Sequence, residues 1–203
     1  MRAELERKWA VFGIALPLMA VGMNFSIVNM AMATLQKHFG ATISELQWLL
    51  NIAGIFVSVL MVTMGKLADV YGRRRLYFAG TLLVCAASLL AGLAPKLGWI
   101  IAAQALQGVA AAVVIPISQA ILSHLYPEEK RAQAIGIWAT LACTSLGLGP
   151  IVGGILIETV GWRSIFLINV PIALLALYPL LQCVPESKNP HAHKHIPFQG
   201  VFL

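Results

Sequence analysis

The sequence predicts an all-α polytopic membrane protein, a bundle of six transmembrane helices, because it is rich in apolar residues and its charges are clustered. Of its 203 residues, 59% are hydrophobic and 11% are charged. Soluble domains usually carry about 25% charged residues. The chain has more apolar surface than a soluble core buries, so a lipid bilayer is its natural solvent.

Six segments without Asp, Glu, Lys or Arg divide the chain, and each is 20 to 31 residues long. A helix crosses the hydrocarbon core in about 20 residues, so each segment accommodates one span. Helices are favoured over strands because lipid offers no partner for unpaired backbone groups. We therefore expect spans at about 9–35, 46–65, 76–95, 98–122, 133–157 and 164–184.

The first of these segments has an alternative interpretation as a cleaved signal peptide, because basic residues precede it. Its apolar stretch is longer than a signal core, and Gly13 and Pro17 interrupt it. We favour a transmembrane helix.

Residues 1–185 are expected to form one membrane domain, with 186–197 as a cytoplasmic linker. The stretch 185–197 holds three prolines and three histidines and few apolar residues, which is typical of an extended linker. We expect neither a metal site nor a cofactor there, because structural zinc sites usually have four ligands and no cysteine is near. The apolar residues 198–203 are too few to span a bilayer and are expected to begin a truncated seventh helix.

The net charge of +6 indicates membrane topology rather than nucleic-acid binding. With the amino terminus in the cytoplasm, the outer side carries only Lys37, Lys96 and Arg163. The other eleven basic residues fall on the cytoplasmic side: Arg2, Arg7, Lys8, Lys66, Arg73, Arg74, Arg75, Lys130, Arg131, Lys188 and Lys194. Positive charge is enriched on the cytoplasmic side of membrane proteins, so both termini are expected there, in the plasma (inner) membrane.

The segment 65–75, between the second and third expected spans, combines two glycines, a carboxylate and a basic cluster. Positive-inside charge alone explains the arginines but not Asp69 at this spacing from Gly65 and Gly72. The pattern G-x-L-A-D-x-x-G-R-R resembles the loop signature of the major facilitator superfamily. That resemblance implies a cytoplasmic gate that includes Arg74, in which Asp69 and Arg73 form a charge network that holds the outward-open state.

A second segment, 145–154, resembles the antiporter motif G-x-x-x-G-P-x-x-G-G of drug/proton exchangers. Its matching residues are Gly149, Pro150, Gly153 and Gly154, and Ser145 replaces the leading glycine. The resemblance implies a kinkable helix with a flat packing face. Generic packing of small residues between helices is the simpler alternative.

Further segments resemble the fourteen-helix drug/proton antiporter branch of this superfamily. Residues 26–29 read S-I-V-N, and residues 162–171 match W-R-x-x-F-x-I-N-x-P. The likeness covers nearly the whole stretch 9–185. It implies that the chain is the amino-terminal half of a transporter fold.

Two positions depart from that branch. An aspartate is expected where Asn24 stands, and an arginine where Gln104 stands. Both became neutral together, which avoids a lone buried charge in the bilayer. As a hypothesis, Asn24, Asn29, Gln104 and Gln107 line a polar cavity. Hydrogen bonding between helices is the alternative.

The sequence thus favours a secondary transporter that exports drugs or other small molecules by alternating access, with no catalytic residues and therefore no enzyme activity. Its expected partners are the lipid bilayer, a small-molecule substrate, and either the missing carboxy-terminal half or a second copy. Proton coupling stays open, because coupling acids could lie in the other half or be absent. The competing hypothesis is a non-transporting remnant or a membrane interaction protein.

Overall fold

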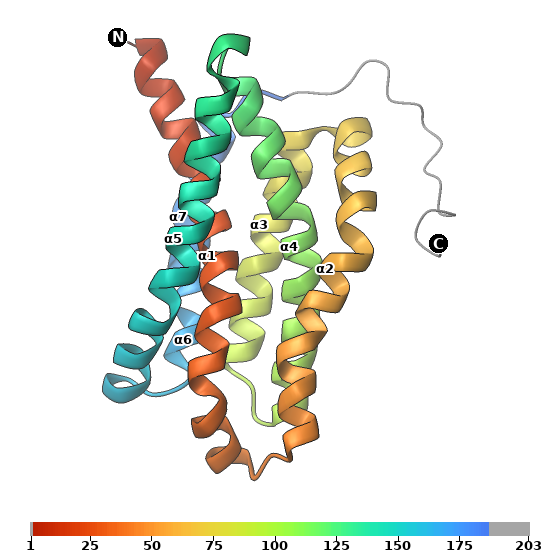
Figure 1. The fold of residues 1–203 in the computed structure, drawn as a ribbon, viewed down its shortest axis with the longest axis vertical. Helices are drawn as coiled ribbons and strands as arrows, with labels where there is room; N and C mark the ends of the chain where they lie inside the picture. The colour runs from red at the N-terminus through yellow and green to blue at the C-terminus, as the bar shows by residue number, and fades with distance from the viewer. Residues whose placement is uncertain (1, 187–203) are drawn as a thin grey trace.

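The computed structural model describes residues 2–186, with side chains from residue 7 onward, as a bundle of long helices packed side by side (Figure 1). In chain order the elements are α1 (Arg2–Phe39), α2 (Ile43–Tyr71), α3 (Arg73–Gly92), α4 (Leu97–Leu125), the short 3-10 helix η1 (Glu128–Lys130), α5 (Arg131–Thr159), α6 (Ser164–Leu167) and α7 (Asn169–Cys183). Within this part of the chain no strand occurs, and six helical segments are long and apolar enough to cross a membrane. The expected all-α, six-helix fold class is confirmed.

Most of the expected linker 186–197, and all of the expected helix start 198–203, lie outside the described residues. Those two expectations stay predictions. Glu186, the first linker residue, is described and proves to be anchored to the bundle, as shown below.

Most helices extend beyond the charge-free segments, because a helix can continue into charged residues after it leaves the apolar layer. The expected spans end at residue 65 and begin again at residue 76, and the loop expected over residues 66–75 is wrong for this reason. Helix α2 continues to Tyr71, α3 begins at Arg73, and only Gly72 separates them. Gly72 has a φ of +111°, which a residue with a Cβ rarely adopts, so the turn between the two helices depends on glycine.

Local chemistry fixes the other helix ends. Helix α2 begins with a capping box in which Glu45 N donates to Thr42 Oγ1 (3.3 Å) and Thr42 N donates to Glu45 Oε2 (2.8 Å). Helix α3 ends at Gly92, before the expected residue 95, because the residue before Pro95 is disfavoured in helical conformation. The sixth span is split into α6 and α7 because Pro171 has no N–H to donate to the carbonyl of Leu167.

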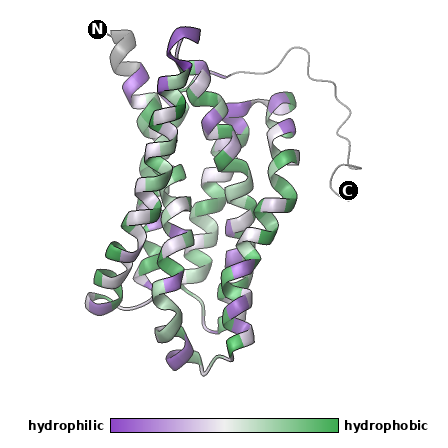
Figure 2. Ribbon diagram, in the orientation of Figure 1, coloured by the Kyte–Doolittle hydropathy of each residue, from purple (hydrophilic) through white to green (hydrophobic). Residues whose placement is uncertain are grey.

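Charged and polar residues gather at the two ends of the bundle, and apolar residues fill the length between them (Figure 2). One end, here called the basic end, holds the start of α1, Gly72, η1 and the end of α7. The opposite end, here called the distal end, holds the connections α1–α2, α3–α4 and α5–α6 (Figure 1). This pattern fits a bilayer, in which charges lie outside the hydrocarbon core.

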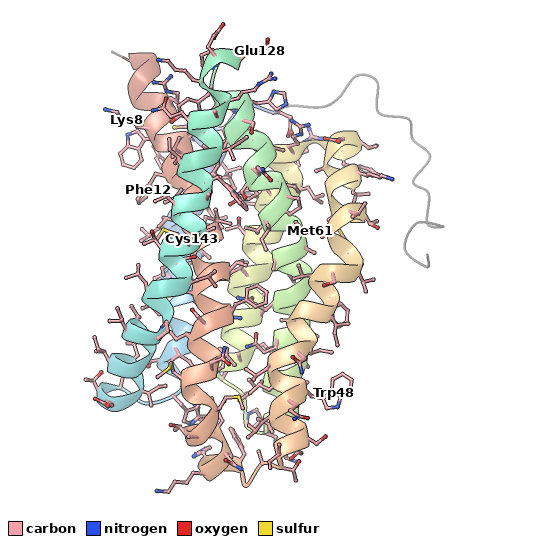
Figure 3. The ribbon with its side chains drawn as sticks, in the orientation of Figure 1. Lys8, Phe12, Trp48, Met61, Glu128 and Cys143 are labelled. Atoms are coloured by element: carbon pink, nitrogen blue, oxygen red, sulfur yellow. The ribbon has the colours of Figure 1, made fainter. Side chains whose placement is uncertain are left out.

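Helices α1 and α4 form the centre of the bundle, while α2 and α5 lie at its flanks. In the apolar spans of α1 and α4, 61% of the residues are buried, compared with 11% for α2 and 17% for α5. Large apolar side chains of α2 point away from the bundle, as Trp48 does in Figure 3. Two of the six spans therefore present most of their surface outward.

The central helix α1 packs closely on α7 and is fastened to α3. A Cβ on Gly13 would lie 2.9 Å from the backbone nitrogen of Leu180, so only glycine permits this approach of α1 to α7. The phenol of Tyr77, on α3, is fully buried and donates a hydrogen bond of 2.7 Å to the carbonyl oxygen of Ile14. A buried hydroxyl in lipid needs such a partner.

We predict that Tyr77→Phe lowers the free energy of unfolding of the chain in detergent by about 1 kcal/mol, the usual contribution of one hydrogen bond. Thermal unfolding followed by circular dichroism measures the change. Tyr178→Phe is the matched control, because Tyr178 is 72% exposed and should tolerate the substitution. Equal melting temperatures for all three proteins would contradict the prediction.

Candidate functional site

The basic end holds an ion pair between Asp69, near the end of α2, and Arg73, at the start of α3. One Asp69 carboxylate oxygen lies 3.0 Å from Nε and 2.9 Å from Nη2 of Arg73. The two side chains are only 34% and 15% exposed, respectively. The pair spans the Gly72 turn, so it couples the directions of α2 and α3.

Glu186 adds a second contact to this turn from the other end of the chain. Its Oε1 accepts a hydrogen bond of 3.1 Å from the backbone nitrogen of Arg74, and its Oε2 lies 3.6 Å from Nε of Arg75. A Cβ on Gly72 would lie 2.5 Å from Oε1 of Glu186, so a side chain there would displace this carboxylate, in addition to the strain of the positive φ. A carboxylate at the first turn of α3 also stabilises the helix dipole.

Arg74 completes the link between α3 and the end of α7. Its Nη1 donates to the carbonyl oxygens of Val184 (3.2 Å) and Leu181 (3.4 Å), which have no partner within their own helix turn. Glu186 and Arg74 therefore join residues more than one hundred positions apart and tie the start of the expected linker to the turn between α2 and α3. Glu186 was not among the site residues predicted from the sequence.

Beside the ion pair, a cleft of about 340 Å³ opens between α3, α4 and α5, lined by Arg73, Ala120, Ser123, His124 and Arg131. Its side chains supply two guanidinium groups, an imidazole and a hydroxyl. The Arg131 guanidinium also pairs with Glu128 across 3.1 Å. Such a cleft is suited to a carboxylate or another anion.

Gly65, the first residue of the gate signature, differs from Gly72. It lies within α2, and a Cβ placed on it would meet no atom within 4 Å. Within the described residues, packing gives no reason for glycine at this position.

The antiporter-like segment lies within α5 and packs against α1. A Cβ on Gly149 would overlap Oγ of Ser26, and a Cβ on Gly153 would lie 2.5 Å from Ile27 Cγ1. In return, a Cβ on Gly22 of α1 would overlap Oγ of Ser145. Side chains of each helix thus pack against glycines of the other helix, and the two helices approach closely.

The remaining two residues of this motif do not face α1 in the same way. Gly154 has open space around its Cα, and Pro150 is exposed. Helix α5 continues through Pro150 without a break. The motif therefore supplies a packing face of Gly149 and Gly153, and its bending role stays a prediction.

The four candidate cavity residues do not come together as one group. Asn24 Nδ2 donates to Gln104 Oε1 across 2.9 Å, joining α1 to α4. Gln107 is buried, but neither of its amide atoms has a hydrogen-bond partner. Asn29 is exposed, and its amide donates to the carbonyl oxygen of Phe25 within α1. The pair of Asn24 and Gln104 is the interhelical hydrogen bond that the sequence analysis held as the alternative.

An exposed polar face that the sequence analysis missed runs along α2. Ser44, Gln47 and Asn51 line a cleft of about 190 Å³, together with Trp48 and Ile55. Ser58 continues the same face, since the spacing of three, four and seven residues places these side chains on one side of a helix. That spacing was visible in the sequence and is the signal that could have found this face.

No group of three His, Cys, Asp or Glu side chains that could hold a metal ion occurs within residues 2–186. The three histidines of the expected linker lie outside the described residues.

These features define an integral membrane protein built on a six-helix half of a transporter fold. A family model described as Major Facilitator Superfamily matches residues 14–200. The chain therefore belongs to the Major Facilitator Superfamily, which confirms the expectation from its gate signature.

Several proteins with similar sequences carry drug-resistance names. The chain is 38% identical over 180 residues to the multidrug resistance protein Stp of Mycobacterium tuberculosis, covering 88% of this chain and 34% of that protein. It is 31% identical over 198 residues to the tetracenomycin C resistance and export protein of Streptomyces glaucescens, covering 97% of this chain and 37% of that protein. The chain thus spans little more than a third of the length of these two relatives.

The fold is also that of a solved transporter. A crystal structure of the peptide transporter POT in complex with sulfate matches with a TM-score of 0.74 at 19% sequence identity, covering 86% of this chain and 37% of that one. At this identity the likeness concerns the fold alone.

We predict that Gly149→Ala destabilises the chain by about 1–3 kcal/mol, the usual cost of overpacking, because the added methyl group would overlap Ser26. Gly154→Ala is the matched control on the same helix, because its Cα faces open space. Chemical unfolding in detergent, followed by tryptophan fluorescence, compares the two variants. If both substitutions have the same effect, the close α1–α5 approach is not as described.

We predict that Glu186→Ala loosens the contact between the end of α7 and the start of α3. Trypsin should then cleave after Arg74 or Arg75 several-fold faster, because the carboxylate contacts of both residues are lost. Glu128→Ala is the control, since Glu128 pairs only with the exposed Arg131. Cleavage is followed by mass spectrometry, and unchanged rates in Glu186→Ala would rule out the anchoring role.

Proposed function

We propose that this chain forms the amino-terminal half of a secondary transporter that exports drug-like small molecules by alternating access. The observation that carries the proposal is the exposure of α2 and α5, whose apolar spans are only 11% and 17% buried. These two outward faces are therefore available for packing against further helices. Those helices would come from a carboxy-terminal half or from a second copy of the chain.

The face of α2 is suited to a substrate pathway as well as to packing. Ser44, Gln47 and Asn51 put polar groups on its exposed side, next to the apolar side chains of Trp48 and Ile55. A surface that mixes polar and apolar groups suits an amphipathic substrate. Asn29 adds an exposed amide on α1. The drug-resistance names of the relatives support a substrate of this class.

The Asp69–Arg73 ion pair and the Glu186 contacts form the proposed gate at the basic end. In alternating access, the basic end of this half would move away from the other half and then close against it again. The ion pair spans the only non-helical residue between α2 and α3, so it holds the geometry of the surface that would close. Following the positive-inside rule, we place this end and both termini in the cytoplasm, with the protein in the plasma membrane.

A non-transporting membrane protein is the second candidate. The observation in its favour is the neutral Asn24–Gln104 pair, which stands where an acid and an arginine were expected from the resemblance. A neutral pair carries no proton, so proton coupling would depend on groups elsewhere. Transport without coupling, or coupling through the other half, accords equally with this pair.

We predict that a chimera of this chain with the carboxy-terminal part of the Stp-type relative exports a lipophilic cation such as ethidium. The chain aligns with 34% of that relative at 38% identity, and in the chimera it replaces this aligned part. Efflux is measured as loss of fluorescence from drug-sensitive cells. In the chimera, Asp69→Ala should reduce efflux at least several-fold, because the gate ion pair is lost.

The control variant is Glu158→Ala, an exposed acid at the distal end, which should leave efflux unchanged. A chimera that reaches the membrane intact but exports nothing, while the unaltered relative does export, would favour the non-transporting candidate. The proposal has two forms, in which the further helices come either from a carboxy-terminal half or from a second copy. The oligomeric state in mild detergent separates them. A homodimer of the 203-residue chain that also exports ethidium from liposomes would support pairing of two copies.

A further inference from the structure

The apolar core of the bundle is divided into two clusters along the membrane normal. The cluster near the basic end includes buried residues within 10–21 of α1, 77–85 of α3, 110–121 of α4 and 173–180 of α7. The cluster near the distal end includes buried residues within 27–35 of α1, 91–94 at the end of α3, 97–103 of α4 and 165–166 of α6. Helices α1, α3 and α4 and the span formed by α6 and α7 therefore each have a short interval without buried members of either cluster.

Buried polar side chains occupy all of these intervals. Each is between 1% and 4% exposed, and each lies between the two apolar clusters within its own span: Asn24 on α1, Ser88 on α3, Gln104 and Gln107 on α4, and Asn169 at the start of α7, after the distal-cluster residues of α6. We call these five residues the polar layer. Four spans thus carry polar groups between the same two clusters.

The close approaches between helices place the layer at one height in the bundle. Gly13 contacts Leu180, and Asn24 and Asn169 each lie 11 residues from this contact on helices that run in opposite directions. Gly80 contacts Val113, and Ser88 lies 8 residues beyond it while Gln107 lies 6 residues before Val113. At about 1.5 Å per residue, Asn24 and Asn169 agree in height within the first pair of helices, and Ser88 and Gln107 agree to about 3 Å within the second. The Asn24–Gln104 hydrogen bond links the two pairs.

Only part of the layer is satisfied by protein groups. Asn24 and Gln104 bond to each other. The hydroxyl of Ser88 and both amide atoms of Gln107 and of Asn169 have no hydrogen-bond partner. Apart from one oxygen of Glu186 at the basic end, these are the unpartnered buried side-chain atoms of the described residues.

Other buried polar side chains of the bundle are satisfied locally, which sets the layer apart. Thr81 donates to the carbonyl oxygen of Tyr77, and Ser145 donates to that of Ala142. Ser118 bonds to both the carbonyl oxygen of Ile115 and the indole of Trp138. The unpartnered groups are therefore concentrated at one level rather than scattered through the core.

We infer that the polar layer is an internal water-binding site, in which ordered water bridges Ser88, Gln107 and Asn169. Each unpartnered buried group costs about 1–3 kcal/mol, and lipid supplies no partner at this depth. Two amides and a hydroxyl offer donors and acceptors together, and water is the small ligand that satisfies both. Buried waters typically make about three hydrogen bonds to such groups.

One edge of the layer, at the bonded pair Asn24 and Gln104 rather than at the three unpartnered residues, has room close to the size of a water molecule. A cavity of about 10 Å³ lies beside Asn24 and Gln104. About 10–15 Å³ is the smallest space of this kind that holds one water molecule. The apolar clusters on either side should stay dry, since empty apolar cavities do not bind water.

Water-edited solid-state NMR of the full chain in lipid bilayers tests this site directly. Magnetisation is transferred from water to ¹⁵N-labelled Asn and Gln side-chain amides, and the build-up rate is measured for each. We expect the amides of Gln107 and Asn169 to build up nearly as fast as that of Gln133, which is exposed at the basic end. Build-up as slow as that of backbone amides at Val113 and Ile117, within an apolar cluster, would overturn the site.

A substitution tests whether the water is shared. Gln107→Leu should slow the transfer to Asn169 several-fold, because the water loses a partner, whereas the matched control Gln119→Leu, at an exposed position of the same helix, should leave it unchanged. Unchanged transfer to Asn169 in a folded Gln107→Leu protein would refute the bridge. The measurement on the unsubstituted chain decides the water site even if this variant does not fold.

Discussion

Lipid offers no hydrogen-bond partner, and the arrangement of this protein follows from that constraint. Backbone groups are satisfied within helices, so the described residues form helices almost throughout. Charged side chains are confined to the ends of the bundle, where Asp69 pairs with Arg73 and Glu186 contacts the start of α3. Polar groups that remain at the centre need each other or water, and the Asn24–Gln104 pair meets this need directly.

The same constraint explains why packing rather than hydrophobic burial decides how the helices associate. Lipid chains are as apolar as the side chains, so close contact of the helices must supply the stability. Helix α1 makes such close contact with α5, where Ser26 packs against Gly149 and Ser145 packs against Gly22. Helices α2 and α5 remain bare on their outer faces, and the proposal of a further half or a second copy rests on this exposure.

The six-span fold and the charged ends could be predicted from the sequence, because the absence of charge over about 20 residues is a local property. The packing partners could not, because they depend on the register between helices: Glu186 and Arg74 lie 112 positions apart. Asn24 and Asn29 lie five residues apart, about 140° around a helix, so Asn24 is buried against α4 while Asn29 stays exposed. Their role as cavity residues stays a prediction. The predicted loop over residues 66–75 was wrong because a charge-free segment marks the apolar part of a helix and not its ends.

The central claim is that the exposed faces of α2 and α5 line a water-accessible pathway in the assembled transporter. Single cysteines at Asn51 and Thr144, in a chain whose Cys85, Cys143 and Cys183 are replaced, test it by reaction with a membrane-impermeant maleimide. Leu175, which is 65% exposed on α7, serves as the lipid-facing reference. Reaction at Asn51→Cys and Thr144→Cys but not at Leu175→Cys is the expected result. Equal protection of all three would show that water does not reach these faces, and would contradict the proposed pathway.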